Sequence, residues 1–260
     1  FPECSDASQV TTDEALALLR AAFQQGAPNG DPIGAVIVEP VQGRAGVRIP
    51  PDGFMAALSD VAIEEGVMVI ADEIFTGLGR CGSMLASEQL GLRPDIVCLG
   101  KILGGGLPLS ACLSSRSVLS AWPENDGEAI HTNTFLGHPL SCATALAVLD
   151  VLEHLGVPEC ARVLGSQLLS ELQESLKDTE KVLEVRGCGL MIGIELVTAD
   201  GSPWKGGAVR VAEAALGQGL ILLPAGEHGH VVELTPSAFL SENQVAHSVA
   251  VLSSIIQAIN

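Results

Sequence analysis

Short apolar runs alternate with helix-prone segments in the first part of the chain. Residues 33–38, 67–71 and 96–99 are short and almost entirely apolar, which is typical of strands buried on both faces of a sheet. A helix is predicted before the first run at residues 12–23, which open with Thr-Asp-Glu, and another at residues 53–65. Strand, helix, strand, short connection and strand in this order predict a parallel sheet with right-handed crossovers.

A second module follows Pro139. Residues 140–155 are expected to form a long helix that links the two parts of the chain. Beyond this helix the pattern predicts further helices at 159–176, at 207–218 and from Ser241 onward, and strands at 182–186, at 190–197 and near Ile221 and Val231. This mixture predicts a smaller α+β domain, so we divide the chain into domains of residues 1–152 and 153–260.

Composition and charge narrow the classes of function. The 260 residues carry 31 acidic and 13 basic side chains, a formal net charge of −18, and only 3% of them are aromatic. Such a negative field repels nucleic-acid phosphates and anionic lipid, and few aromatic rings are present on which bases could stack. We therefore expect no nucleic-acid partner and no membrane partner. No apolar stretch approaches the about 18 residues that a membrane span needs.

Cysteine usage indicates the compartment. Seven cysteines are scattered without any C-x-x-C spacing, and several lie in apolar runs: Cys4, Cys81, Cys98, Cys112, Cys142, Cys160 and Cys188. An odd number in this pattern is typical of small buried side chains in a reducing compartment. We expect a cytoplasmic protein without a metal site.

Each of the three predicted strands ends at an ionisable residue. Glu39 follows the first strand, Asp72 follows the second, and Lys101 follows the third after one glycine. Ligands of open parallel α/β sheets bind at the carboxyl ends of the strands, so these side chains are expected to face one crevice. Lys101 lies between an apolar run and a glycine-rich stretch. Loss of hydration there favours the neutral, nucleophilic amine; the alternative is a strand-end lysine that extends to solvent.

A lysine and an aspartate at neighbouring strand ends match what pyridoxal 5'-phosphate requires of a protein. The lysine forms a Schiff base with the cofactor and then moves a proton between substrate carbon and cofactor. The aspartate keeps the pyridine nitrogen protonated, so that the ring accepts electrons. We therefore expect pyridoxal phosphate as the cofactor of Lys101 and Asp72.

Four motifs resemble those of the class III (omega-type, ornithine/4-aminobutyrate-like) aminotransferases. They are EPVQG at 39–43, ADEIFTGLGR at 71–80, PDIVCLGK at 94–101 and HTNTFLGHP at 131–139. A less distinct likeness extends to the C-terminal helix. The resemblance implies the α/β fold type I of pyridoxal phosphate transferases, here as part of a large parallel or mixed-sheet domain plus a smaller C-terminal α+β domain. It also implies amino transfer from a primary amine or amino acid to an oxo acid or aldehyde.

Carried over position by position, the family pattern implies roles for five residues. Lys101 resembles the lysine that forms the aldimine, Asp72 the partner of the pyridine nitrogen, and Ile74 the branched side chain on the ring face. Thr134 resembles the threonine that reaches the cofactor phosphate of the neighbouring subunit, which implies a homodimer. Glu39 resembles a glutamate on the substrate side, which we count as catalytic together with Lys101. Without the resemblance, Ile74 is typical of a core residue and Thr134 of a helix start.

Two family features are missing from the sequence. The Gly-Ser/Thr turn that cradles the cofactor phosphate and the aromatic residue that stacks on the ring lie, in the family, upstream of the region seen here. The resemblance thus covers a C-terminal portion, and we expect a separate N-terminal polypeptide to complete the large domain and cover its open sheet edge. The glycine run at 104–106 is interpreted as a flexible loop rather than as the phosphate cradle.

The C-terminal region bears on the substrate. Many family members have an arginine for the substrate α-carboxylate in a strand before Pro-Pro, and Glu233 occupies the corresponding place in VVELTPS at 231–237. An acid repels a carboxylate and attracts a cation. An amine, diamine or carrier-bound donor with a small oxo acceptor is therefore favoured. Phe75 likewise stands where other members often have a polar residue.

Two alternatives remain open from the sequence. An aminomutase or racemase would use the same Lys101 and Asp72. A non-catalytic aminotransferase-like subunit is favoured by the missing cradle and disfavoured by the retained Lys101, Asp72 and Thr134.

Overall fold

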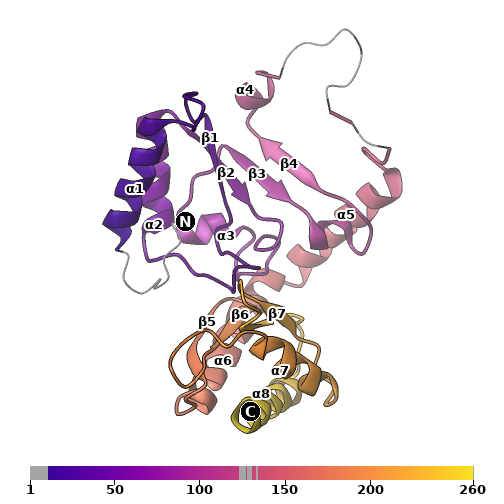
Figure 1. The fold of residues 1–260 in the computed structure, drawn as a ribbon. Helices are drawn as coiled ribbons and strands as arrows, with labels where there is room; N and C mark the ends of the chain where they lie inside the picture. The colour runs from indigo at the N-terminus through magenta and orange to yellow at the C-terminus, as the bar shows by residue number, and fades with distance from the viewer. Residues whose placement is uncertain (1–10, 123–126, 128–130, 133, 260) are drawn as a thin grey trace. The chain divides into compact units, whose positions relative to one another are not determined.

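The computed structural model in Figure 1 describes residues 11–122, 127, 131, 132 and 134–259. Asn133, Cys4 and the first ten residues of the predicted 1–152 domain lie outside the described residues. The chain divides into two compact units. The first comprises the described residues up to Pro40 together with Pro50–Phe75 and Ser87–His154, and the second comprises Val41–Ile49, Thr76–Ala86 and the described residues from Leu155 on.

The first unit is an α/β layer whose elements follow the predicted order. They are α1 (Thr12–Gln25), β1 (Ala35–Val38), α2 (Phe54–Glu65), β2 (Met68–Asp72), α3 (Ala86–Leu90), β3 (Ile96–Leu99), the 3-10 turn η1 (Lys101–Gly104), β4 (Ala111–Ser114), α4 (Arg116–Leu119) and α5 (Pro139–His154). The helix start is local: Thr11 accepts from the Glu14 backbone N–H while the Glu14 side chain accepts from the Thr11 N–H, a capping box.

The sheet of the first unit has the strand order β1-β2-β3-β4. β1 pairs with β2 and β2 with β3 in parallel, which confirms the predicted parallel sheet. β4 pairs with β3 in the antiparallel sense. The sequence pattern does not predict β4, because its four residues Ala-Cys-Leu-Ser form neither an apolar run nor a long alternation.

One face of this sheet carries the core of the unit. Val38, Val69 and Ala71 pack in one cluster with residues of α1 and α2, and Figure 1 shows both helices next to β1 and β2. Side chains alternate between the two faces along a strand, so Asp72 projects to the face opposite Ala71. Ile37, on that same second face, is 62% exposed.

The second unit is an antiparallel α+β layer. Its elements are α6 (Val157–Leu176), β5 (Val182–Cys188), β6 (Met191–Leu196), α7 (Gly207–Leu216), β7 (Leu223–Ala225), β8 (Val231–Leu234) and α8 (Glu242–Ala258). The strand order is β5-β6-β8-β7. One sheet face packs against α6, α7 and α8 through a cluster that includes Leu172, Ile194 and Leu252. The strand expected near Ile221 begins at Leu223 instead, where the chain first pairs with β8, and Ile221 is 85% exposed.

Two short segments from earlier in the chain pack onto this second sheet because glycines leave room for them. A Cβ atom at Gly193 would lie 3.1 Å from Val47 Cβ and 3.2 Å from the Gly46 carbonyl oxygen. A Cβ atom at Gly189 would lie 2.4 Å from the Cys81 carbonyl carbon. The distance at Gly189 is one that a Cβ atom cannot adopt unless the backbone moves, and at Gly193 a Cβ atom would require its neighbours to shift by a few tenths of an ångström, so both positions favour glycine.

Two expectations from composition can be compared with the structure. Of the six described cysteines, Cys81 is buried and Cys112 is exposed, while the others are half-buried. The expectation of small buried side chains is therefore wrong for Cys112, which lies on the edge strand β4. Among the described helices none alone is long and apolar enough to cross a membrane, and α5 and α6 pass that test only as a bent pair.

Candidate active site

Three ionisable side chains follow the carboxyl ends of adjacent strands in the first unit. Strand pairing aligns Val38 of β1 with Ala71 of β2, so Glu39 and Asp72 are the next residues along the two strands. Asp72 in turn pairs with Cys98 of β3, three residues before Lys101. The structure thus places Glu39, Asp72 and Lys101 at the carboxyl ends of neighbouring strands. This is the side of the sheet at which parallel α/β sheets bind ligands.

Asp72 is half-buried and held by the backbone. Its Oδ1 atom accepts a hydrogen bond of 3.0 Å from the Ile74 N–H, and the next residue, Glu73, is tied to β3 because its N–H donates to the Cys98 carbonyl oxygen at 3.0 Å. Glu73 also accepts a hydrogen bond of 2.6 Å from the Ser87 N–H in a buried position. Hydrogen bonds therefore hold the residues that directly follow Asp72 at the end of β2.

Lys101 differs from the sequence-based expectation. Its side chain is exposed, so the loss of hydration expected from its apolar surroundings is wrong for the described chain. The reason is local: Leu99 and Leu103 take the buried positions, and the Lys101 Nζ atom lies 4.5 Å from the centroid of the Phe75 ring. A cation over an aromatic face is attracted by the ring quadrupole. The Phe75 ring, and not a polar side chain, therefore orients the Lys101 amine.

The backbone at Lys101 is strained. Lys101 has φ of 46°, in the left-handed region that side chains other than glycine rarely adopt. Gly100, before it, packs so closely that a Cβ atom there would lie 3.3 Å from Ile74 Cγ2. Ile74 is half-buried, and its contact with Gly100 links the turn after β2 to the turn after β3. Sterically unfavourable backbone of this kind clusters at functional sites.

Helix α5, which lies later in the chain, packs against the turn that follows Lys101. The sequence pattern did not predict this contact. Thr144 Oγ1 donates a hydrogen bond of 3.0 Å to the Gly104 carbonyl oxygen at the end of η1. Gly105 has φ of 58°, and a Cβ atom there would lie 2.9 Å from Val148 Cγ2. The glycines after Lys101 thus allow close packing against α5 and do more than make the loop flexible. The glycine run is the sequence feature that could have indicated this packing.

Thr134 lies in an exposed turn before α5. It precedes the start of α5 at Pro139 by several residues, so the helix-start alternative is not what the structure has. His138 takes that role: its Nδ1 atom lies 3.1 Å from Ser141 Oγ and accepts from the Ser141 N–H at 3.4 Å. Phe135, at 68% exposure, stacks edge-on against the His138 ring.

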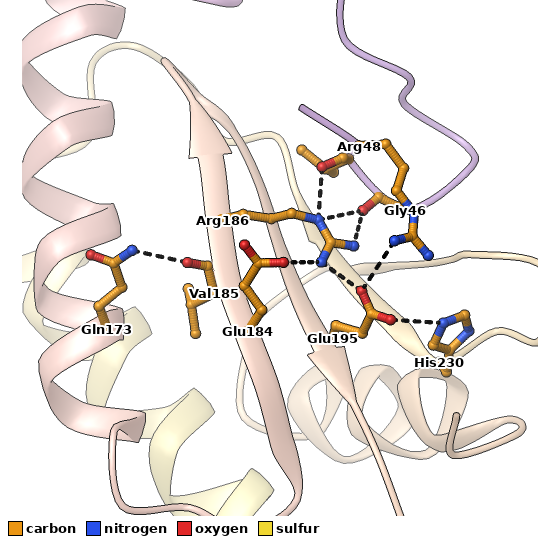
Figure 2. Close-up of polar contacts among 9 residues, drawn as sticks. Gly46, Arg48, Gln173, Glu184, Val185, Arg186, Glu195 and His230 are labelled. Carbon is orange, nitrogen blue, oxygen red and sulfur yellow. Dashed lines mark hydrogen bonds and ion pairs between the residues drawn. The ribbon is translucent and has the colours of Figure 1, made fainter. Parts of the chain in front are cut away.

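The second unit contains a buried ion-pair network that sequence reasoning also missed (Figure 2). The Arg186 guanidinium donates to Glu195 Oε2 at 2.5 Å, to Glu184 Oε2 at 2.8 Å and to the Gly46 carbonyl oxygen at 2.6 Å. It also donates to the Val47 carbonyl oxygen at 2.9 Å. Val47 has φ of 51°, so Arg186 holds a strained turn onto the sheet. The sequence feature that could have indicated this network is an arginine inside a predicted strand, two residues before Cys188.

Opposing effects set the ionisation of this network. Burial alone would raise the pKa of Glu195, but the charge and hydrogen bond of Arg186, with Arg48 beyond it, outweigh burial and lower that pKa. Burial lowers the pKa of His230, and Arg48 acts in the same direction, while the neighbouring Glu195 partly opposes them. Glu195 Oε1 lies 3.5 Å from His230 Nε2. The network therefore favours an ionised Glu195 beside a neutral His230.

Glu233 lies on β8 in the second unit. Its side chain is 1% exposed, and its strand partners are Gly193 of β6 and Leu223 of β7. The carboxylate belongs to the sheet face that also carries Arg186 and Glu195, because Val232 and Leu234 point to the opposite, apolar core.

Comparison with known proteins gives a consistent family likeness. The family model described as "Aminotransferase class-III" matches residues 2–256. The acetylornithine aminotransferase of Methanothermobacter thermautotrophicus is 37% identical over 227 residues, which are 87% of this chain and 55% of that protein. The putrescine aminotransferase of Pectobacterium atrosepticum is 41% identical over 182 residues, 69% of this chain and 38% of that protein.

Solved structures agree. The amine transaminase of an uncultivated Pseudomonas species, solved in its PLP-bound internal-aldimine form, superposes with a TM-score of 0.86 at 34% identity, covering 96% of this chain and 57% of that one. The α/β fold of the pyridoxal phosphate transferases is thereby confirmed. The chain spans about half the length of the curated relatives it matches.

Proposed function

The chain belongs to the class III aminotransferases, and from this premise we propose that it supplies the lysine and aspartate of a pyridoxal phosphate-dependent amino-transfer site. The observation that supports this most strongly is the placement of Asp72 and Lys101 at one edge of a parallel sheet, after adjacent strands. A carboxylate held by a backbone hydrogen bond and an exposed amine are the donor set that this cofactor needs, so the residues fit it.

Each proposed residue has a distinct task. When bound, pyridoxal phosphate supplies an electron-accepting ring. Asp72 keeps a proton on the pyridine nitrogen, and Lys101 holds the cofactor through its Nζ atom and moves a proton to and from the substrate carbon. Ile74 would pack against one face of the ring, and Glu39 would line the substrate side.

Assembly is the second part of the proposal. Ile37 on β1 and Leu113 on β4 are 62% and 51% exposed, and these strands form the two edges of the described sheet. Parallel sheets are normally covered on both faces. We infer that a separate N-terminal polypeptide pairs with these edges, brings the phosphate cradle and dehydrates Lys101. The exposed Thr134 turn then reaches the neighbouring site of a homodimer.

The substrate is proposed from charge. Glu233 stands where an arginine for an α-carboxylate would be expected, so that position supplies no cation for a carboxylate, which favours a donor without an α-carboxylate, such as a diamine. The likeness to a putrescine aminotransferase is in accord with this choice. The acceptor is a small oxo acid or aldehyde. Free cysteines are typical of a reducing compartment, so the proposed location is the cytoplasm.

Three single variants, assayed for exchange between a diamine and an oxo acid together with the completing N-terminal polypeptide, test the proposal. Lys101→Ala should lower turnover on the order of 10³-fold while the fold is retained. Asp72→Ala should weaken pyridoxal phosphate binding about 10- to 100-fold, with turnover falling in parallel. Lys177→Ala, at an exposed position, is the matched control and should behave as the unchanged protein. Full activity of Lys101→Ala would remove the proposed mechanism.

A further inference from the structure

The segment Val41–Ile49, here called loop 41–49, begins two residues after Glu39 and belongs to the second unit. The loop is closed at its base, where the backbones of Gln42 and Arg48 exchange two hydrogen bonds of 3.0 and 2.9 Å. Val47, inside the loop, is fully buried. Loop 41–49 is therefore a packed part of the second unit and not a free surface segment.

The Arg186 side chain, on β5, holds this loop on the second sheet (Figure 2). Its Nε and Nη2 atoms both donate to the Gly46 carbonyl oxygen, at 3.2 and 2.6 Å, and Nε also donates to the Val47 carbonyl oxygen at 2.9 Å. Gly46 lies so close to the sheet that a Cβ atom there would come within 2.9 Å of Val231 Cγ2. Arg186 is 8% exposed, so this contact is internal to the second unit and does not depend on what covers its surface.

Two carboxylates neutralise the buried guanidinium on its other side. The Arg186 Nη1 atom donates to Glu195 Oε2 at 2.5 Å and to Glu184 Oε2 at 2.8 Å. Arg48, from the loop itself, has its Nη1 atom 3.8 Å from the same Glu195 oxygen. The planar guanidinium thus binds carbonyl groups along one edge and carboxylates along the other, which the single ammonium group of a lysine cannot do.

The chain between this loop and Glu39 is short and stiff. Pro40 is the one residue between Glu39 and the loop, and its ring fixes φ at about −65°. A residue that precedes proline is confined to extended backbone, so Glu39 loses conformational freedom as well. On its other side Glu39 directly follows Val38, the last residue of β1. The path of the chain through Glu39 is therefore set by β1 before it and by loop 41–49 after it.

We propose that Arg186 is a positioning residue for the amine donor: by holding loop 41–49 it fixes Glu39, and so raises the affinity for the donor without contacting donor or cofactor. This inference rests on the proposed function, in which Glu39 lines the substrate side. Glu195 takes part through its ion pair with Arg186, which keeps the guanidinium in place. A loosened loop lets the Glu39 carboxylate adopt more orientations, of which fewer bind the donor, so the cost falls on donor binding.

Hydrogen exchange of the full chain measures the hold on the loop without any cofactor. Arg186→Lys keeps a cation beside Glu195 but loses the contact along two edges, so the hydrogen-bonded amides of loop 41–49 should exchange on the order of 10-fold faster. The amides of β2 should keep their exchange rates. The matched control is Gln173→Ala, which removes a hydrogen bond of 2.9 Å to the Val185 carbonyl oxygen of the same strand and should leave the loop amides unchanged.

Steady-state kinetics test the link to Glu39. The protein is assembled with its N-terminal polypeptide and assayed with diaminobutane as donor and pyruvate as acceptor. Arg186→Lys should raise KM for the donor on the order of 10-fold with little change in kcat, and Glu39→Gln should raise the same KM. In the double variant the two effects should not add, because Arg186 acts through Glu39. Gln173→Ala should leave both constants unchanged.

Thermal melting checks that each variant is folded. If Arg186→Lys does not fold, Glu195→Gln weakens the ion pair without removing the guanidinium, takes its place and should give the same pattern. Unchanged loop exchange in the folded variant would overturn the proposal, and so would KM effects that simply add to those of Glu39→Gln. An active protein whose KM does not respond overturns the role of Arg186 alone. An unchanged protein that transfers no amino group overturns the proposed function together with this role.

Discussion

Lys101 is unusual among the described residues in both conformation and position. Together with Val47 and Leu78 it makes up the set of non-glycine residues with positive φ in the described chain. The left-handed conformation costs a side chain about 1 kcal/mol or more, and nothing in the apolar run before Lys101 predicts it. The conformation follows from the sharp turn between β3 and η1, where Gly100 packs on Ile74.

Replacing Lys101 separates the cost of its backbone from the role of its amine. Both Lys101→Ala and Lys101→Gly remove the amine, but only glycine relieves a φ of 46°. We expect Lys101→Gly to unfold at higher urea concentration than Lys101→Ala, by about 1 kcal/mol in free energy of unfolding. The matched control is Lys177, whose φ is −53°; there the glycine variant should be the less stable of the two. Equal stability of the two Lys101 variants would refute backbone strain at this site.

Strands and helices were largely predictable from the sequence, whereas their tertiary contacts were not. The apolar runs at 33–38, 67–71 and 96–99 correspond to β1, β2 and β3, although the described residues bury only one face of this sheet and leave Ile37 62% exposed on the other. The sequence pattern did not predict β4, because its strand conformation depends on pairing with β3. The packing of 41–49 and 76–86 onto the second unit depends on missing Cβ atoms at Gly193 and Gly189, which a one-dimensional pattern does not reveal.

Arg186 is the residue on which the second sheet's polar face depends. Arg186→Met leaves Glu195 buried at 6% exposure without its principal cation, so the free energy of unfolding should fall by about 3–5 kcal/mol. Combining it with Glu195→Gln should cost less than the sum, with a coupling of about 0.5–3 kcal/mol in a double-mutant cycle. Arg162→Met breaks an exposed pair with Glu159 and should change little. Simple additivity in the cycle would contradict the network.

Acid should destabilise the second unit in two steps. The pKa of His230 lies below its usual value of 6.5 in the folded chain, so below 6.5 the unfolded chain takes up a proton that the folded one does not, and stability falls. The pKa of Glu195 lies below 4.5 when folded, so its contribution is present above 4.5 and is lost as pH falls through the folded value. His230→Gln should remove the upper step alone in urea titrations from pH 7 to 3. A flat stability profile between pH 7 and 5 would be incompatible with this assignment.

At the scale of the whole molecule, the two edges of the first sheet decide how the chain behaves by itself. Exposed apolar strands pair with other chains unless they are covered. We expect the isolated chain to self-associate in sedimentation velocity, and Ile37→Lys with Leu113→Lys to reduce the association. Ile221→Lys, at 85% exposure outside any strand, is the control and should have no such effect. A folded, monodisperse monomer of the unchanged chain would contradict the need for a completing polypeptide.

Borohydride reduction of the protein with pyridoxal phosphate shows directly whether Lys101 is the lysine that binds the cofactor. The chain has four lysines, Lys101, Lys177, Lys181 and Lys205, so peptide mapping after reduction separates specific from random labelling. With the N-terminal polypeptide present, we predict a phosphopyridoxyl group on the Lys101 peptide at cofactor concentrations that leave the other three unlabelled. Labelling of all four lysines alike, or none at Lys101, would show that Lys101 is not the cofactor lysine.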